Sequence, residues 1–456
     1  MNFKSVAFHH FGCKVNFAEA SSLSRKFRDI GVDVRDFHEQ ADVYVISTCV
    51  VTAVAEKKCR AAIRQAHKLN PFAKIAVIGC FSELKPGELQ QMEGVDLVLG
   101  HSGKFQLLEE LVKLDRLSDP KQQGNTTEIQ GNAGNHDDHD HNYHGGVKPE
   151  KHTGSDVFMP SFSYGDRTRS FLKIQDGCDY YCTYCTIPLA RGKSRSGTIA
   201  DVINDARKII DNGIKEIILT GVNIGDFGRQ SGENFDQLIH ALDELEGISR
   251  IRISSIEPDL LTNEIIEFIA SSRNFLPHFH IPLQSGCNTI LKAMHRKYNR
   301  ELYRERIEKI RSLMPGACVA ADVIIGFPGE TDEYFEETLG FLQKLDISFL
   351  HVFPYSKRDN TLAAKMVAVV PDKIKKERSD KLHKLSVEKK HLFYQQNIGK
   401  EVGVLFESDN SHGFMHGFSE NYIKVKTTYN PELVNRIVQV KLDNLIEECF
   451  LVDVAF

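Results

Sequence analysis

Short apolar runs alternate with amphipathic stretches along most of the chain. Before residue 114, the runs SVAFHHF, DVYVIST, AKIAVIG and VDLVLG have the character of buried strands. Residues 17–29 and 54–68 have the apolar spacing of helices. This alternation predicts an α/β domain over residues 1–114 with a mostly parallel sheet.

The region 161–394 repeats the alternation six times. Its strand-like runs are FLKIQ, KEIILTG, RIRISS, HFHIPL, VAADVIIG and ISFLHVFPY, and the stretches between them have helical spacing: 199–211, 235–245, 260–272, 289–295 with 301–313, and 331–345. Six successive units predict an α/β fold with a partial (βα)6 barrel, whose functional groups gather at the carboxyl ends of the strands. A polar helix follows at 371–394. The short β runs of 395–456 predict a small β-barrel.

Residues 115–160 interrupt these patterns. The segment is rich in Gly, Asn, Gln and His and poor in large apolar residues, which predicts a disordered or loosely held linker. Its histidines stand beside aspartates and are able to bind divalent metals weakly: His136, His139, His141 and His144. We favour a solvated insert without a specific ligand.

Composition and charge narrow the class of protein. The chain has 456 residues, 41% of them hydrophobic, and a net charge of -5, so bulk charge does not indicate a nucleic-acid binder. No apolar run reaches the roughly 18 to 20 residues of a membrane span, and no secretory signal is evident. We therefore expect a cytoplasmic protein without a membrane partner, in which ten cysteines serve as metal ligands or catalytic thiols rather than disulfides.

The most specific motif is CDYYCTYC, which directly follows the strand-like run FLKIQ. It places Cys178, Cys182 and Cys185 on one loop. Three thiolates can hold three irons of a [4Fe-4S] cluster and leave the fourth iron open for a substrate ligand. Structural zinc is the alternative, but it normally takes a fourth protein ligand, and none lies nearby in this segment.

This CxxxCxxC loop at the first strand of a six-unit barrel resembles the radical S-adenosylmethionine superfamily. Further blocks are similar to the methylthiotransferase family over nearly the whole chain: FGCKVN, STCVVT, IGCFSE, FLKIQDGCDYYCTYCTIPLARG, HIPLQSGCN and DVIIGFPGET. Within that family, KVN after Cys13, Val51 with Thr52, HVFPYSKR and AAKM most resemble the branch that acts on N6-threonylcarbamoyladenosine in tRNA.

The resemblance implies two [4Fe-4S] clusters and S-adenosylmethionine as radical source and methyl donor. At the loop cluster, the methionine amine and carboxylate would chelate the open iron, and reductive cleavage would give a 5′-deoxyadenosyl radical. Cys13, Cys49 and Cys80, each just after a predicted strand, would hold the second cluster, where sulfur is carried and methylated. The alternative is three buried core cysteines.

The same resemblance suggests the cofactor contacts. Tyr184 would lie beside the adenine, although packing explains an aromatic residue there equally well. Polar groups and glycines expected at the strand ends would bind the amine, carboxylate and ribose: Gly221, Asn223, Ser255, Glu257, Gln284 and Asp322. Arg191 and Arg195 would neutralise the cofactor carboxylate or a substrate phosphate, unless they are solvated surface residues.

The other four cysteines are expected to be structural. Cys59 lies in the middle of a predicted helix, and we interpret Cys318 and Cys449 as core residues. Cys287 follows a strand end near the expected pocket, and we predict a packing role for it rather than a redox role.

The predicted reaction replaces the C2 hydrogen of N6-threonylcarbamoyladenosine at position 37 of tRNA with a methylthio group, using an external electron donor and sulfur source. The tail resembles the RNA-holding TRAM module, and Phe414, Phe418 and Tyr422 would stack on bases or belong to its core. Residues 397–456, however, carry five basic and nine acidic side chains. Three alternatives therefore stay open: methylthiolation of an aspartate of a ribosomal protein, methylthiolation of N6-isopentenyladenosine in tRNA, and a non-catalytic iron or zinc module.

Overall fold

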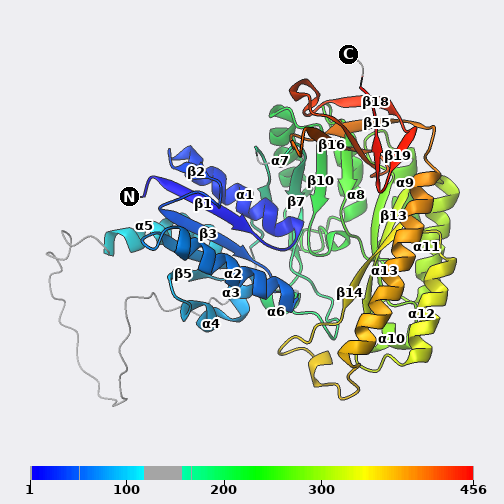
Figure 1. Cartoon of the computed structure of the whole chain (residues 1–456), viewed down its shortest axis with the longest axis horizontal. Helices are drawn as coiled ribbons and strands as arrows, with labels where there is room; N and C mark the ends of the chain where they lie inside the picture. Colours follow the sequence, from blue (N-terminus) through cyan, green and yellow to red (C-terminus); the bar gives the residue numbers. More distant parts are fainter. Residues whose placement is uncertain (1–2, 51, 118–156, 166, 455–456) are drawn as a thin grey trace. The chain divides into compact units, whose positions relative to one another are not determined.

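Five parallel strands form the sheet of the amino-terminal part of the chain (Figure 1). The computed structural model describes residues 3–50, 52–117, 157–165 and 167–454. Contacts divide the chain into two units, Met1–Ser155 and Asp156–Phe456. In the first unit the strand order is β2-β1-β3-β4-β5, with β1 Ser5–His10, β2 Asp33–Arg35, β3 Val43–Thr48, β4 Lys74–Gly79 and β5 Val95–Leu99. The predicted parallel sheet is thus confirmed.

Helices cover this sheet because their apolar stripes pack on its buried strands. Val6, Phe27, Val45 and Leu111 belong to one core that joins both kinds of element. The Thr52 hydroxyl caps the second helix by accepting a hydrogen bond from the Ala55 amide at 3.1 Å. The helices are α1 Lys14–Asp29, α2 Ala53–Leu69, α3 Cys80–Leu84, α4 Pro86–Gln90, the 3-10 turn η1 Gly103–Gln106 and α5 Leu107–Leu117.

The second unit contains the six predicted parallel strands in two sheets. One sheet has the order β11-β10-β7-β6, with β6 Ser161–Phe162 antiparallel to β7 Ser170–Lys173, followed by β10 Glu216–Thr220 and β11 Arg250–Ile253. The other is β12 His278–Gln284, β13 Cys318–Ile325 and β14 Phe349–Pro354. Parallel bridges from Ile251 to Phe275 and from Ser255 to His280 connect the two sheets into one series.

Helices lie along one side of these strands, and Figure 1 shows α13 beside β13 and β14, with α12 next to α13. Ala321 and Val323 belong to the core that packs against these helices, so Asp322 between them faces the other side of the sheet. The helices are α6 Ile187–Arg191, α7 Ile199–Asp211, α8 Phe235–Asp243, α9 Asn263–Ser271, α10 Asn288–Ala293, α11 Arg300–Leu313, α12 Asp332–Lys344 and α13 Asp372–Gln395.

A six-stranded sheet ends the chain, in the order β18-β15-β16-β17-β20-β19. Its strands are β15 Glu401–Phe406, β16 Phe414–Ser419, β17 Lys424–Thr428, β18 Ile437–Lys441, β19 Asn444–Ile446 and β20 Cys449–Leu451. The four predicted β runs are present, and β16 and β19 are additional.

Buried charges attach this sheet to the parallel strands. Arg250 donates to the Gly403 carbonyl at 2.7 Å, and Arg252 donates to the Glu420 carbonyl at 3.1 Å. The carboxylate of Glu216 in β10 accepts from Arg252 at 2.9 Å. These three side chains are almost fully buried, so the contact belongs to the core of the unit.

The aromatic residues of this sheet take part in the same contact. Phe418 and Tyr422 stack at 4.8 Å, Arg169 lies 4.6 Å over the first ring, and Arg252 lies 4.8 Å over the second. Both rings are half-buried and pack against these arginines, which supports a packing role; stacking on bases stays a prediction for them. Phe414 is 37% exposed, so its proposed stacking on bases stays a prediction.

The described helices include none that combines the length and the apolarity needed to cross a membrane. Residues 118–156 of the predicted linker, which include His136, His139, His141 and His144, lie outside the described residues.

Candidate active site

The loop with Cys178, Cys182 and Cys185 lies between the two strands of a short ribbon, in which β8 Gln175–Asp176 pairs with β9 Arg195–Ser196. Gly177 opens the loop at φ +69°, where a Cβ atom would lie 1.9 Å from the Lys193 carbonyl oxygen. Only glycine, which has no Cβ atom, allows the backbone to come this close to the Lys193 carbonyl. The Cys178 amide then donates to the Gly192 carbonyl at 3.1 Å, which fixes the start of the loop.

Each sulfur of the loop accepts a hydrogen bond. The donors are the Tyr180 amide to Cys178 at 3.3 Å, the Ile187 amide to Cys185 at 3.5 Å and the Arg296 guanidinium to Cys182 at 3.1 Å. N–H groups directed at sulfur favour the thiolate form that binds metal.

Burial raises the pKa of all three thiols, to about 12 for Cys185, because it penalises their charged forms. The negative charges of neighbouring sulfurs raise the pKa of Cys178 and Cys185 further. A bound cation would remove both penalties. Three half-buried or buried sulfurs on one loop therefore fit an iron–sulfur cluster with one open iron better than a closed four-ligand zinc site.

Arg296 connects the cysteine loop to the strand ends. It forms an ion pair with Glu257, which follows β11, and its guanidinium lies 3.5 Å from the Tyr184 hydroxyl. Burial raises the pKa of Glu257 to about 7 despite Arg296, and the charge of Asp322 contributes to the rise. Arg296 can therefore hold Cys182 and Glu257 in fixed positions.

The expected cofactor contacts at Gly221 and Asn223 belong to a turn after β10. Their turn is tied to the cysteine loop, because the amides of Val222 and Asn223 both donate to the Gln175 side chain, at 3.0 and 2.7 Å. A Cβ at Gly221 would lie 3.0 Å from the Gln175 carbonyl oxygen, which explains the glycine. Within the described residues, buried Oδ1 of Asn223 and of Asp259 have no hydrogen-bond partner. Such acceptors fit the amine or ribose hydroxyls of the expected cofactor.

Two of the other expected contacts also lie at strand ends. Ser255 follows β11 and bridges to His280, and Gln284 ends β12 with a left-handed backbone at φ +67°. A positive φ is uncommon for a residue other than glycine and occurs often at functional sites.

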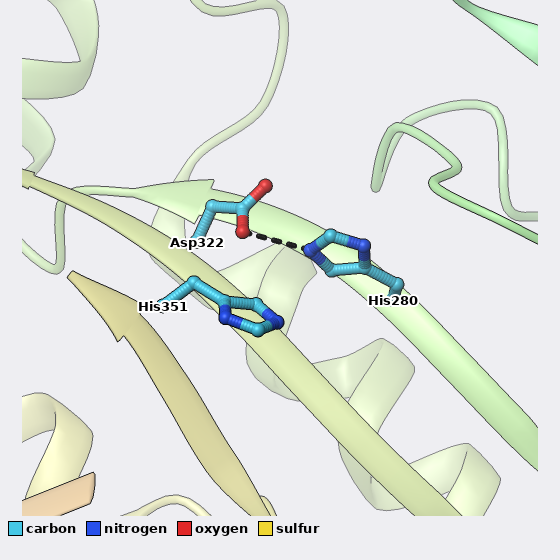
Figure 2. A group of neighbouring side chains, drawn as sticks. All are labelled: His280, Asp322 and His351. Carbon is cyan, nitrogen blue, oxygen red and sulfur yellow. Dashed lines mark hydrogen bonds and ion pairs between the residues drawn. The ribbon is translucent and has the colours of Figure 1, made fainter. Parts of the chain in front are cut away.

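Asp322 differs from the expectation, because it lies within β13 and not at its end. Its Oδ1 atom is 2.7 Å from Nε2 of His280 in β12, and His351 of β14 lies beside it (Figure 2). The position inside the strand follows from the length of β13, which continues through the apolar residues Val323 to Ile325.

Arg191 and Arg195 are buried around Asp176, so the interpretation as solvated surface residues is wrong. The Asp176 carboxylate lies 2.8 Å from Arg191, 3.4 Å from Arg195 and 2.7 Å from Lys173. Arg195 also donates to the Arg191 and Lys193 carbonyls, at 2.7 and 3.0 Å. These contacts stabilise the ribbon that carries the cysteine loop. The proposed contact of the two arginines with the cofactor carboxylate or a substrate phosphate stays a prediction.

In the first unit, Cys13, Cys49 and Cys80 follow β1, β3 and β4, which are neighbours in the sheet. Cys13 precedes α1 and is exposed, whereas Cys49 and Cys80 are buried. Gly12 has φ +98°, and a Cβ there would lie 2.9 Å from the Cys49 sulfur, so the loop before Cys13 packs directly on Cys49. This arrangement suits a shared metal site at one edge of the sheet.

The remaining cysteines lie elsewhere. Cys59, Cys287 and Cys318 are at most 1% exposed, which confirms them as core residues, and Cys449 is half-buried in β20. Burial raises the pKa of Cys59 to about 11, which makes this thiol unreactive at neutral pH.

Comparison with known proteins decides the family. The chain is 39% identical to the threonylcarbamoyladenosine tRNA methylthiotransferase of Bacillus subtilis (strain 168), over 96% of this chain and 93% of the relative. The corresponding protein of Thermotoga maritima is 34% identical, over 98% and 96%. The chain belongs to the radical SAM tRNA methylthiotransferase family. As a member of this radical S-adenosylmethionine (SAM) family it is an enzyme, a transferase that uses S-adenosylmethionine and a [4Fe-4S] cluster.

Other matches agree with this radical SAM methylthiotransferase assignment. The radical SAM superfamily model matches residues 172–342, and that of the uncharacterized protein family UPF0004 matches residues 5–100. The tRNA-2-methylthio-N(6)-dimethylallyladenosine synthase of Bacillus subtilis is 32% identical, over 95% of this chain and 82% of the relative.

A solved structure agrees with the fold alone. The radical S-adenosylmethionine methyltransferase TsrM from Kitasatospora setae aligns with a TM-score of 0.54 at 14% identity, over 76% of this chain and 72% of that chain.

Several residues of the site escaped the sequence reasoning. Arg296, Asp259 and His280 lie far along the chain from the cysteine motif, and the roles of all three and of Asp176 depend on tertiary contacts. Local signals existed only for the last two: Asp176 directly precedes the motif glycine, and His280 begins the HIPLQSG block.

Proposed function

We propose that this chain methylthiolates C2 of the adenine in N6-threonylcarbamoyladenosine at position 37 of tRNA. The observation that carries the proposal is the similarity, over nearly the full length, to relatives named for threonylcarbamoyladenosine tRNA methylthiotransferase activity, at 32 to 39% identity. The cysteine loop would hold the cluster needed for the radical chemistry that breaks an unreactive C–H bond.

In this proposal Cys178, Cys182 and Cys185 hold three irons of the radical cluster. A cluster held there, with S-adenosylmethionine bound, would supply the radical chemistry that breaks a C–H bond. Arg296 keeps the Cys182 sulfur in place through a 3.1 Å hydrogen bond and pairs with Glu257. Unpartnered acceptors near the loop, with Gly221, Ser255, Glu257 and Gln284, bind the amine and ribose of the cofactor.

Cys13, Cys49 and Cys80 hold a second [4Fe-4S] cluster, which supplies the sulfur for transfer. Their positions after three neighbouring strands support this assignment. The electrons and the replacement sulfur come from external donors.

The proposal extends to the architecture of the second unit. The six parallel strands form a partial (βα)6 barrel, and the carboxy-terminal sheet is a TRAM-like domain that holds the RNA. Lys424 and Lys426 of β17 lie on this sheet, the second 5.6 Å over the Phe414 ring, and offer a cationic and aromatic surface.

The test is reconstitution of both clusters under anaerobic conditions, followed by reaction with dithionite, sulfide, S-adenosylmethionine and tRNA that contains threonylcarbamoyladenosine. Mass spectrometry of the digested RNA should show that hydrogen has been replaced by a methylthio group. Cofactor cleavage without any modified nucleoside would contradict the proposed substrate.

An alternative substrate is an aspartate of a ribosomal protein, because the carboxy-terminal segment 397–456 is acidic and would suit a basic protein. The same reaction with purified ribosomal proteins distinguishes the two. Methylthiolated protein and unmodified RNA would favour the alternative.

A further inference from the structure

Three side chains from adjacent strands converge next to the candidate active site: His280 of β12, Asp322 of β13 and His351 of β14 (Figure 2). Asp322 pairs in register with His351, and its Oδ1 atom is 2.7 Å from Nε2 of His280. The two imidazole rings lie 5.2 Å apart. We refer to these three residues as the His–Asp–His group.

This group lies on the face of the sheet opposite the core that packs against the helices, and it is accessible. The side chains of His280 and Asp322 are 22% and 19% exposed, and His351 is exposed. A ligand can therefore reach all three without unfolding the strands.

Contacts link the group to the cysteine loop. The strand of His280 bridges to Ser255, two residues before Glu257, Glu257 pairs with Arg296, and Arg296 donates to the Cys182 sulfur. A substrate atom next to the cluster would therefore have its neighbouring substituents within reach of the His–Asp–His group.

The chemistry of the group is complementary to a polar substituent. Imidazole N–H groups donate hydrogen bonds, and the carboxylate of Asp322 accepts them. A threonylcarbamoyl group carries carboxylate and carbonyl acceptors together with hydroxyl and N–H donors. A dimethylallyl group has none of these, and it would leave the polar side chains of the site unpaired.

We propose that His280, Asp322 and His351 bind the threonylcarbamoyl substituent of the substrate adenosine and discriminate against a dimethylallyl substituent. This inference rests on the proposed function and adds the residues that select the substrate. Sites that hydrogen-bond a substrate reject an analogue without those polar groups much more strongly than apolar pockets reject an added one.

The experiment compares two anticodon stem-loop RNAs that differ only in the N6 substituent, threonylcarbamoyl or dimethylallyl. The reconstituted enzyme receives both in equal amounts, and mass spectrometry gives the ratio of their kcat/KM values. For the unmodified chain we expect a preference for threonylcarbamoyl of at least about 100-fold. Fluorescence anisotropy measures the Kd of each RNA independently of turnover.

His351→Phe keeps a ring but removes its polar atoms, and Asp322→Asn keeps the shape but removes the charge. Each substitution should lower kcat/KM for the threonylcarbamoyl RNA by about 10- to 100-fold, mainly by raising KM. The Kd of this RNA should rise by a similar factor. Binding of the dimethylallyl RNA should stay the same or improve. His383→Phe on the exposed face of α13 is the matched control. It should change neither the ratio of the two kcat/KM values nor the Kd of either RNA.

The outcomes separate this inference from the proposed function. If the unmodified chain fails to methylthiolate the threonylcarbamoyl RNA, the proposed function fails and the inference with it. If that reaction occurs but both variants keep the original preference and affinity, the inference alone is overturned.

A divalent cation is the competing ligand, because one ligand atom from each of the three residues lies within 4.8 Å of the others. Elemental analysis of the reconstituted enzyme tests it. One zinc ion per chain that is lost in Asp322→Asn, together with unchanged RNA selectivity, would overturn the proposal.

Discussion

At the residue scale, Asp176 shows how a charge supports the cluster loop without being part of it. Asp176 stands just before the cysteine motif and is 1% exposed. Its carboxylate forms ion pairs with Lys173, Arg191 and Arg195. The sequence identified both arginines but not their partner, because their spacing of 15 and 19 residues from Asp176 corresponds to no local motif. Charge pairing of this kind depends on the β8–β9 ribbon, which only the fold creates.

Asp176→Asn should lower the free energy of unfolding by about 3 kcal/mol, because it removes a buried charge that pairs with three buried cations. Urea denaturation followed by circular dichroism measures the change. Asp211→Asn, at an exposed position at the end of α7, serves as the control and should change the free energy by less than about 0.5 kcal/mol. An equally small effect at Asp176 would show that these contacts add little.

The two groups of cysteines should fail in different ways. Cys178→Ala removes a ligand of the radical cluster and should abolish formation of 5′-deoxyadenosine. Cys49→Ala should leave that reaction intact but stop methylthiolation, since it affects only the sulfur-bearing site. Chromatography of both products is the measurement, and Cys287→Ala in the apolar core is the control. Methylthiolated RNA from Cys49→Ala would contradict the division of roles.

At the scale of the element, Gly177 controls the turn from β8 into the cysteine loop. Alanine there would meet the Lys193 carbonyl oxygen at 1.9 Å in addition to the strain of φ +69°. Gly177→Ala should therefore displace the loop and lower the iron bound per chain after reconstitution, measured by iron analysis. Gly213→Ala has a similar φ of +78° but open space, so it should cost about 1 kcal/mol of stability and leave iron binding unchanged. Equal iron content in both variants would refute the steric account.

The elements with clear periodicity were predictable, and the short ones were not. The six parallel strands and the helix at 199–211 follow from apolar runs and amphipathic spacing. In β2, the three residues DVR carry no apolar run, and in β16 the sequence FMHGFS does not alternate in a regular way. Pairing with neighbouring strands creates both. The position of Asp322 was missed because β13 continues three residues beyond it.

At the scale of the whole molecule, the buried carboxylate of Glu216 pairs with arginines that reach from the parallel strands to the carboxy-terminal sheet. Burial alone would raise the pKa of Glu216, but Arg252 and Arg169 hold it below the ordinary value. Because the folded form binds this proton less readily, the ion pair stabilises the protein above a pH of about 4.3, the ordinary pKa of glutamate. That stabilisation is lost as the pH falls through the lower pKa of the folded state.

Glu216→Gln should therefore destabilise the protein at neutral pH and reduce the loss of stability on acidification. Thermal unfolding measured between pH 3 and pH 7 tests both effects. Glu407→Gln removes a partner of Arg169 that is only half-buried, and it should have a smaller effect at every pH. The same pH dependence in Glu216→Gln as in the unmodified chain would show that this pair does not carry the effect.

The central claim is the modification of threonylcarbamoyladenosine in tRNA, and nucleoside mass spectrometry of tRNA from a deletion strain and its parent tests it most directly. The account predicts that the methylthio derivative disappears in the deletion strain. It should return with the intact gene but not with Cys178→Ala. An unchanged nucleoside profile in the deletion strain would contradict the account and direct attention to ribosomal proteins as the substrate.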